Sequence, residues 1–204
     1  WAIFRERCQI EGELARAAAR QGTDDEYTLH HVLEVLLQRV VKAPGLALAR
    51  VADELAAAEL ALEKANTFPD PDCRHVISQY PAEQTLFLSD FYMPAPMLRE
   101  LLSHHGLDDI AGLGLSSCDL RLNKRSGQLF RHVHEAFAVA PEHHVHIGDN
   151  AHADVSIPGA IGTKSVHYLP EQPHADRQLR EGLFADRATL FAHLEGIIAA
   201  SRDE

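Results

Sequence analysis

The sequence has few cysteines and no long apolar run. Its three cysteines, Cys8, Cys73 and Cys118, are scattered and odd in number. This pattern argues against a disulfide framework and predicts a reducing compartment, the cytoplasm. No apolar run approaches the ~20 residues of a membrane-spanning helix, and the first residues do not resemble a signal peptide. The sequence therefore predicts a protein with no membrane partner.

Positive charge is also scarce. Lysine and arginine number 19 against 30 aspartates and glutamates, which gives a net charge of -11. This balance argues against a nucleic-acid partner or an anionic membrane surface. A small phosphorylated molecule stays compatible with it, because one lysine and a metal ion can bind phosphate on an acidic protein. The length of 204 residues and a hydrophobic content of 46% suit one α/β domain with a small appendage.

Residues 1–66 carry the apolar periodicity of helices alone. Thr23-Asp24-Asp25-Glu26 fits a capping box for the second helix. Three apolar stripes predict the packing faces of a small helical bundle. They are Ile3, Phe4, Cys8, Leu14 and Ala18; then Leu29, Val32, Leu33, Leu36, Leu37 and Val40; then Leu48, Val51, Leu55, Ala58 and Leu62.

Residues 67–204 begin with a linker and one short helix over 67–82. After this linker, short apolar runs alternate with helices. This alternation predicts an α/β fold with parallel pairing in a doubly wound sheet. The expected strands are 85–88, 113–115, 144–147 and one within 160–166, and the expected helices are 94–103, 125–137 and 187–200.

Polar residues follow three of the expected strands. Ser89 and Asp90 follow the first, Ser116-Ser117 and then Lys124 follow the second, and Gly148-Asp149-Asn150 and then Asp154 follow the third. In open α/β sheets ligands bind at this carboxyl edge. A hydroxyl can donate to a phosphoryl oxygen, an ammonium can neutralise its charge, and paired carboxylates can hold Mg²⁺. The pattern therefore predicts a site for phosphate and metal.

Each of these residues also has a purely structural interpretation. Ser89, Asp149 or Asn150 can cap a helix, Lys124 can be an ordinary surface lysine, and Asp154 can be a solvated helix residue. The 14 histidines fall mostly on expected helix surfaces or ends, without companion cysteines, so they do not predict a zinc or nickel site. His146 and His152 flank the carboxylates and can touch a substrate or tune the local charge.

At these motifs the chain resembles the haloacid dehalogenase (HAD) superfamily of phosphohydrolases. The resemblance is closer to a branch often found alongside or fused to glycosyltransferases, and it covers nearly the whole chain. Three segments carry it in order. They are Ser89-Asp90-Phe91-Tyr92-Met93-Pro94; Ser116-Ser117 with Lys124-Arg125-Ser126-Gly127-Gln128-Leu129-Phe130; and His146-Ile147-Gly148-Asp149-Asn150 with Asp154.

The resemblance implies a mostly parallel, Rossmann-like core over 67–204 and an incomplete C1-type helical cap over 1–66. It implies a Mg²⁺-dependent phosphatase or phosphotransferase acting on a small phosphorylated metabolite, by analogy a sugar phosphate. Its partners would be a glycosyltransferase domain or a second copy of the chain. The implied roles are catalysis for Ser89 and Lys124, substrate binding for Ser89, Asp90, Lys124 and Asn150, and metal binding for Asp149 and Asp154.

One motif of that family is missing. The nucleophile should lie in an Asp-x-Asp segment after a central first strand, ahead of the cap. Asp70-Pro71-Asp72 reads as a linker turn, Asp90 has Tyr92 in place of the second acid, and Asp108-Asp109 reads as a loop.

Without the first strand, the sheet would have two unpaired inner edges. The chain starts at Trp1 in what reads as mid-helix, so we expect an upstream strand with its Asp-x-Asp in a longer protein. Alternatively, another segment or another chain fills the gap. Direct pairing of strand 85–88 with strand 144–147 would contradict the missing strand. The chain alone is expected to be inactive, and the alternative function is a non-catalytic HAD-like module, a scaffold or partner domain of a glycan-building enzyme.

Overall fold

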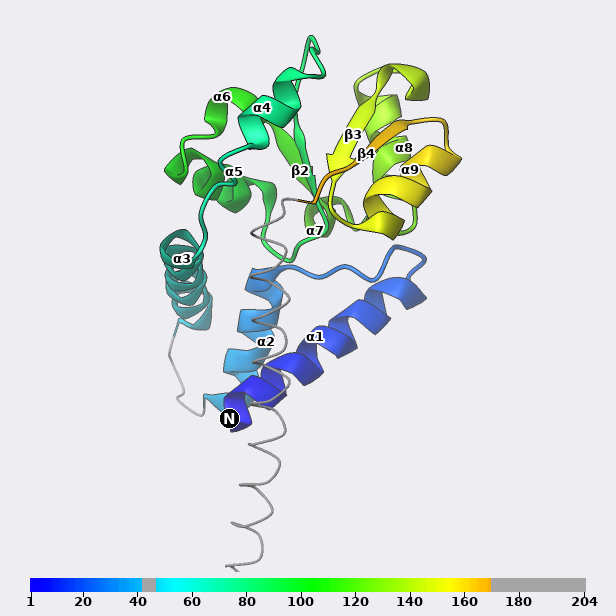
Figure 1. The fold of residues 1–204 in the computed structure, drawn as a ribbon. Helices are drawn as coiled ribbons and strands as arrows, with labels where there is room; N and C mark the ends of the chain where they lie inside the picture. The colour runs from blue at the N-terminus through cyan, green and yellow to red at the C-terminus, as the bar shows by residue number, and fades with distance from the viewer. Residues whose placement is uncertain (42–46, 170–204) are drawn as a thin grey trace, which may run out of the picture. The chain divides into compact units, whose positions relative to one another are not determined.

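Helices make up the first part of the chain, and short strands alternate with helices in the second (Figure 1). The structure is a computed structural model that describes residues 1–41 and 47–169. It confirms a mixed α/β fold with short parallel strands. The predicted helix 187–200 lies outside the described residues. Within the described residues, no helix combines the length and the apolar character needed to cross a membrane.

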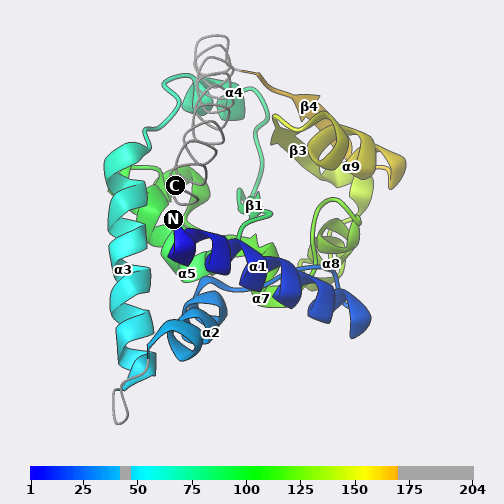
Figure 2. The same ribbon diagram turned by 90° about the horizontal axis from the view of Figure 1, so that it is seen from below.

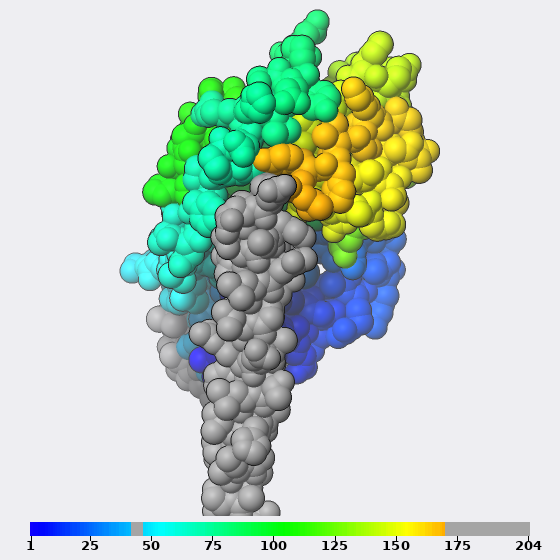
Figure 3. All heavy atoms as spheres, viewed as in Figure 1, coloured from blue at the N-terminus to red at the C-terminus, as the bar shows by residue number. Residues whose placement is uncertain are grey.

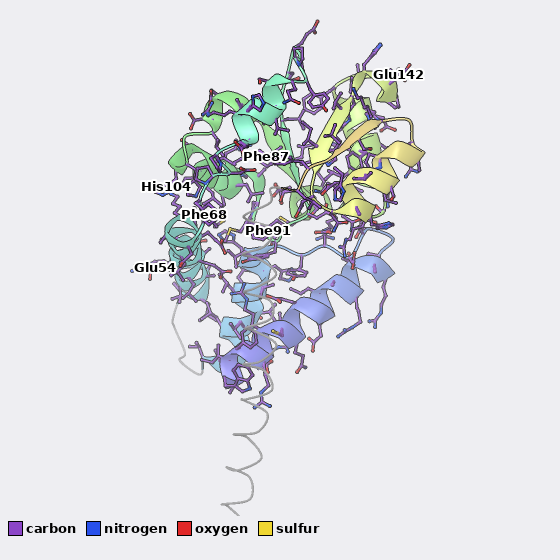
Figure 4. All side chains as sticks on the ribbon, viewed as in Figure 1. Glu54, Phe68, Phe87, Phe91, His104 and Glu142 are labelled. Carbon is purple, nitrogen blue, oxygen red and sulfur yellow. The ribbon has the colours of Figure 1, made fainter. Side chains whose placement is uncertain are left out.

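The first three helices are α1 (Ala2–Arg20), α2 (Leu29–Val40) and α3 (Leu48–Asn66). Helix α2 contacts both of the others, and its apolar stripe is buried as predicted, except for Val40. Phe87 and Phe91, both labelled in Figure 4, pack against the core cluster formed by α2, α3 and α5. The buried residues of that cluster are Leu29, Leu33, Leu37, Ala52, Ala56, Leu60, Met93 and Leu98.

The predicted faces of α1 and α3 were wrong in part. In α3 the buried residues are Ala52, Ala56 and Leu60, whereas Leu55 and Leu62 are exposed. The small alanines allow close approach to α2 and α5, so the larger leucines do not mark the contact face. In α1 the buried residues are Ile10 and Ala18, and the exposed members of the predicted stripe are Ile3, Phe4 and Cys8.

The predicted capping box is also wrong. Helix α2 begins after Thr28, whose hydroxyl accepts a hydrogen bond from the His31 backbone N–H at 3.3 Å. Thr23 instead donates its hydroxyl to the Ala18 carbonyl at the end of α1. The acidic segment 24–26 therefore does not cap α2. Its carboxylates instead accept hydrogen bonds from Asn123, in a loop about a hundred residues further along the chain.

The strands form two separate parallel pairs. β1 (Phe87–Ser89) pairs with β2 (Gly114–Ser116), and β3 (Val145–Gly148) pairs with β4 (Lys164–His167). Within the described residues β1 and β3 are not paired, and Figure 2 shows their ribbons apart. The pairing that would have contradicted the missing strand is absent from this part of the chain.

The connecting helices agree with the sequence pattern in outline. Asp108-Asp109 begins a short helix rather than a loop, and α8 begins at Gln128 rather than Arg125 because residues 124–127 form a turn. Asp70-Pro71-Asp72 is a turn as predicted, closed by the Asp72 N–H and the Asp70 carboxylate. The remaining elements are α4 (Cys73–Ser78), α5 (Ala95–His104), α6 (Asp108–Ala111), α7 (Ser117–Leu120), α8 (Gln128–Ala136), η1 (Pro141–His143), η2 (Ala151–Ser156) and α9 (Ile157–Ala160).

Candidate functional site

The six predicted site residues all line one pocket of about 530 Å³. Ser89 and Asp90 come from the end of β1, and Lys124 comes from the turn before α8. Asp149, Asn150 and Asp154 come from the end of β3 and from η2, which pack together with β4 in the yellow and orange region of Figure 3. Segments far apart in the sequence thus meet at this pocket. Its other lining residues are Ala15, Asp25, Glu26, Tyr27, Phe91, Tyr92, Arg125 and Ala153.

Lys124 and Asp154 form a largely buried ion pair. The distance from Lys124 Nζ to Asp154 Oδ1 is 2.6 Å, and the two side chains are 13% and 3% exposed. The same oxygen accepts a hydrogen bond from His146 Nε2 at 2.9 Å, and Oδ2 accepts one from the Asn150 N–H at 3.0 Å. A carboxylate has about four acceptor positions, so these donors leave room for about one further ligand on Asp154.

The hydrogen bonds keep Asp154 charged. Burial alone would raise the pKa of its carboxyl, but the bonds with His146 and Lys124 outweigh burial and hold the pKa well below its usual range. The Asp154 carboxylate is therefore ionised at neutral pH, where it pairs with Lys124 beside the pocket.

Gly148 is required by the position of Asp154. A Cβ atom on Gly148 would lie 2.5 Å from Asp154 Cγ and 2.6 Å from Oδ2. The carboxylate therefore lies directly against the backbone at the end of β3. This close approach explains the glycine of the Gly148-Asp149 run.

Asn150 caps the helical turn that carries Asp154. Its Oδ1 accepts hydrogen bonds from the N–H groups of His152 and Ala153 at 3.0 and 2.9 Å, at the start of the π-helix η2. The capping interpretation is therefore correct for Asn150 and not for Asp149. Asp149 is exposed at the pocket wall, and its carbonyl accepts a hydrogen bond from His167 Nε2.

Asp90 holds the turn that presents Lys124. Its Oδ1 accepts the Lys124 backbone N–H at 2.8 Å. Its Oδ2 is buried and makes no hydrogen bond within the described residues, with Arg125 Nε at 3.8 Å. A buried carboxylate oxygen without a hydrogen bond is costly, so this atom is suited to accept a bond from a ligand.

The serines at the strand ends have different environments. Ser89 lines the pocket, and its hydroxyl makes no hydrogen bond to the described residues. Ser116 and Ser117 are fully buried. Ser116 donates to the Met93 carbonyl at 2.7 Å, and Ser117 donates to Glu26 Oε2 at 2.6 Å. Of these three serines, Ser89 alone has a hydroxyl placed to meet a ligand.

An acidic segment, Asp24-Asp25-Glu26, contributes Asp25 and Glu26 to the pocket lining and was missed as a functional feature. Asp24 Oδ2 accepts the Asn123 backbone N–H at 2.7 Å and the Ser126 hydroxyl at 2.6 Å. Glu26 Oε1 accepts the Asn123 side-chain amide at 3.1 Å and faces Arg125. Asp24 and Glu26, which lie between α1 and α2, therefore hold the turn that carries Lys124 in place. The run of three carboxylates was the available signal, but nothing in its spacing named its partner.

Three histidines cluster beside the site, between α8 and β3. His134 Nε2 and His144 Nδ1 lie 3.1 Å apart, and the rings of His144 and His146 lie 6.2 Å apart. Burial lowers the pKa of His144 to about 4, with help from its two histidine neighbours. The spacing of 144 and 146, which puts both on one face of a strand, was the signal for this cluster.

The charges of the pocket suit a divalent cation. Five carboxylates, those of Asp25, Glu26, Asp90, Asp149 and Asp154, line it against the cations of Lys124 and Arg125. Across the described residues, no three histidine, cysteine or acidic side chains converge as a metal-binding group. Mg²⁺ commonly takes only one or two protein carboxylates and completes its shell with water and phosphate. Asp149 and Asp154 fit that donor set.

A comparison of the sequence with protein-family models and with curated proteins gives no match. The functional argument therefore depends on the site itself.

Proposed function

We propose that this chain is the phosphate- and metal-binding part of a HAD-like, Mg²⁺-dependent phosphohydrolase that acts on a small phosphorylated metabolite. The observation that supports the proposal most is the buried Lys124–Asp154 pair in a pocket that Ser89 and Asp149 also line. Each of the three motif segments of the HAD resemblance contributes residues to the lining of this pocket.

The donors of the pocket suit a phosphoryl group. The Lys124 ammonium has three N–H groups, and Asp154 accepts the one bond that this ammonium makes within the described residues. The Ser89 hydroxyl lines the same pocket. Positioning and charge stabilisation of this kind account for most of the catalysis of phosphoryl transfer.

Asp149 and Asp154 would hold Mg²⁺, which when bound neutralises phosphoryl charge. Asp149 is exposed at the pocket wall, and Asp154 keeps about one acceptor position. Lys124 would bind a phosphoryl oxygen, and Asp90 would keep the turn of Lys124 in place. Asn150 would act through its cap on η2 rather than by direct substrate contact.

The nucleophile would come from a further parallel strand between β1 and β3, completing a Rossmann-like sheet. Each of these strands has a partner on one side, and no described strand pairs with its other side. In a parallel sheet an inserted strand would end at the same edge as Ser89 and Asp149. Its last residue would then reach the pocket beside Lys124.

A non-catalytic module, a scaffold or partner domain of a glycan-building enzyme, is the second candidate. The interactions of two pocket carboxylates favour this second candidate. Asp154 is committed to Lys124 and His146, and Asp90 is committed through Oδ1 to the Lys124 N–H. Neither is suited to attack a phosphoryl group. The partner would be a glycosyltransferase domain or a second copy of the chain.

Hydrolysis of an aryl phosphate by the whole protein that the gene encodes tests the proposal. We expect Mg²⁺-dependent activity that Lys124→Ala lowers by about 10²–10³-fold. Lys64→Ala is the matched control, because Lys64 pairs with Glu100 at the surface of α3 and α5. The 204-residue chain alone should be inactive. Whole protein that is inactive in Mg²⁺ would favour the module, and activity of the chain alone that Asp149→Ala abolishes would place the nucleophile within it.

A further inference from the structure

His146 is buried directly behind the Lys124–Asp154 pair. It lies in β3, is 8% exposed and places Nε2 2.9 Å from Asp154 Oδ1. It is not among the residues that line the pocket. Whatever His146 does for the site, it does through Asp154 rather than by touching a ligand.

The environment of His146 fixes its ring. Phe130, which is fully buried, meets the ring edge to face at a centroid distance of 4.9 Å and an angle of 81°. Asp154 Oδ1 also pairs with Lys124 Nζ at 2.6 Å, and a carboxylate in such a pair can only accept hydrogen bonds. The hydrogen of this contact must therefore be on His146 Nε2.

The orientation of the Asp154 carboxylate depends on donors from separate segments. The Asn150 N–H holds Oδ2, while Lys124 and His146 share Oδ1. The Lys124 side chain is long and flexible, so its amino group can follow the Asp154 carboxylate but cannot fix the orientation of that carboxylate. The rigid imidazole is the side chain that can set the direction of Oδ1.

We propose that His146 is a positioning residue whose Nε2–H holds the Asp154 carboxylate so that Oδ1 faces Lys124 Nζ inside the pocket. The consequence for phosphate rests on the proposed function, since the Lys124 ammonium is then held where a phosphoryl group would bind. The consequence for the ion pair itself does not rest on it.

The matched variants are His146→Gln, His146→Leu and His144→Leu. A glutamine can bring its Nε2 donor close to the position of the histidine Nε2, whereas leucine fills space without a donor. His144 precedes β3 on the same face and has no hydrogen bond to Asp154, since its bond goes to His134. It therefore reports the effect of losing a neighbouring, half-buried histidine.

The experiment measures nitrogen-detected NMR spectra of the 204-residue chain and its variants, and the binding of inorganic phosphate in Mg²⁺ by calorimetry. We expect His146 to carry its hydrogen on Nε2 and Lys124 to give an ammonium signal protected from exchange with water. His146→Leu should lose that signal and bind phosphate about tenfold more weakly, as for one lost hydrogen bond to a charged group. His146→Gln should keep the signal and bind within about threefold of the parent, and His144→Leu should match the parent.

Three results would overturn the proposal. They are a hydrogen on Nδ1 alone, a Lys124 signal that survives in His146→Leu, and a loss in His146→Gln equal to that in His146→Leu while both remain folded. If the signals behave as expected and no chain binds phosphate, the role of His146 stands and the proposed function fails. A thermal unfolding scan of each variant separates a local loss from unfolding.

Discussion

The helical part of the chain and the part that carries the strands differ in the polar residues that they bury. Helices α1 to α3 bury apolar side chains, with Leu29 and Ile10 fully inaccessible. The strands have only three or four residues each. Around them the buried residues include Ser116, Ser117, Asn123, His146, Asp154 and Thr163. The comparison indicates that apolar packing sets the stability of the chain, while a hydrogen-bond network sets the geometry of the pocket.

The largest expected effect is on the apolar side of this comparison. Leu29→Ala removes a fully buried side chain from the core cluster and should lower the free energy of unfolding by about 2–5 kcal/mol. Leu62→Ala, at a residue 63% exposed, should change it by less than about 0.5 kcal/mol. Urea unfolding of both variants measures the difference. Equal effects would mean that α2 does not carry the core.

Acid should act on the polar side of the comparison. The pKa of His144 is lowered to about 4 from an ordinary value of 6.5, so the folded state favours the neutral ring. The stability that the neutral His144 ring contributes is fully present above pH 6.5 and is lost as the pH falls from 6.5 to 4. The loss in the free energy of unfolding reaches about 3 kcal/mol. Urea midpoints across this range should fall more in the parent than in His144→Leu. Parallel pH profiles for the two would contradict the assignment.

Gly148→Ala should damage the site more than the fold. The added Cβ would lie 2.5 Å from Asp154 Cγ, so the carboxylate must leave its present position beside Lys124, at a cost of about 1–3 kcal/mol. Gly159→Ala is the control, since its Cβ would meet nothing closer than 3.7 Å. We expect the protected Lys124 ammonium signal to disappear in the first variant only. An unchanged signal in Gly148→Ala would contradict the close approach.

The smallest effect concerns the contact between the two parts. Glu26→Gln weakens the bonds of a nearly buried carboxylate to Ser117 and Arg125 and should lower the free energy of unfolding by about 1 kcal/mol. Glu142→Gln, at an exposed residue labelled in Figure 4, should have no measurable effect. If the two glutamine variants unfold at the same urea concentration, the acidic segment does not stabilise the turn of Lys124.

Local sequence patterns predicted the positions of the strands and the end of helix α5. Short apolar runs mark the strands in the sequence. Three strands begin one or two residues after their predicted starts. Gly106, with φ of 68°, ends α5 as expected. The buried face of α3 was mispredicted because its buried residues include Ala52 and Ala56, and alanines carry a weak apolar signal.

Which residues meet at the pocket was predictable from the sequence, but their hydrogen-bond network was not. Ser89, Lys124, Asp149 and Asp154 stand out because polar residues after strands meet at one edge. The partners of Asp24 and Glu26 lie about a hundred residues away, and no spacing within one sequence encodes such a contact. The same holds for His146, whose role depends on the position of Asp154 in a π-helix.

Binding of inorganic phosphate to the 204-residue chain tests the central claim most directly. Calorimetry in the presence of Mg²⁺ should show binding by the parent and by Lys64→Ala, and at least about tenfold weaker binding by Lys124→Ala. Removal of Mg²⁺ with a chelator should weaken binding by the parent as well. Equal affinity in the parent and Lys124→Ala, or no binding by the folded parent, would contradict a phosphate site at this pocket.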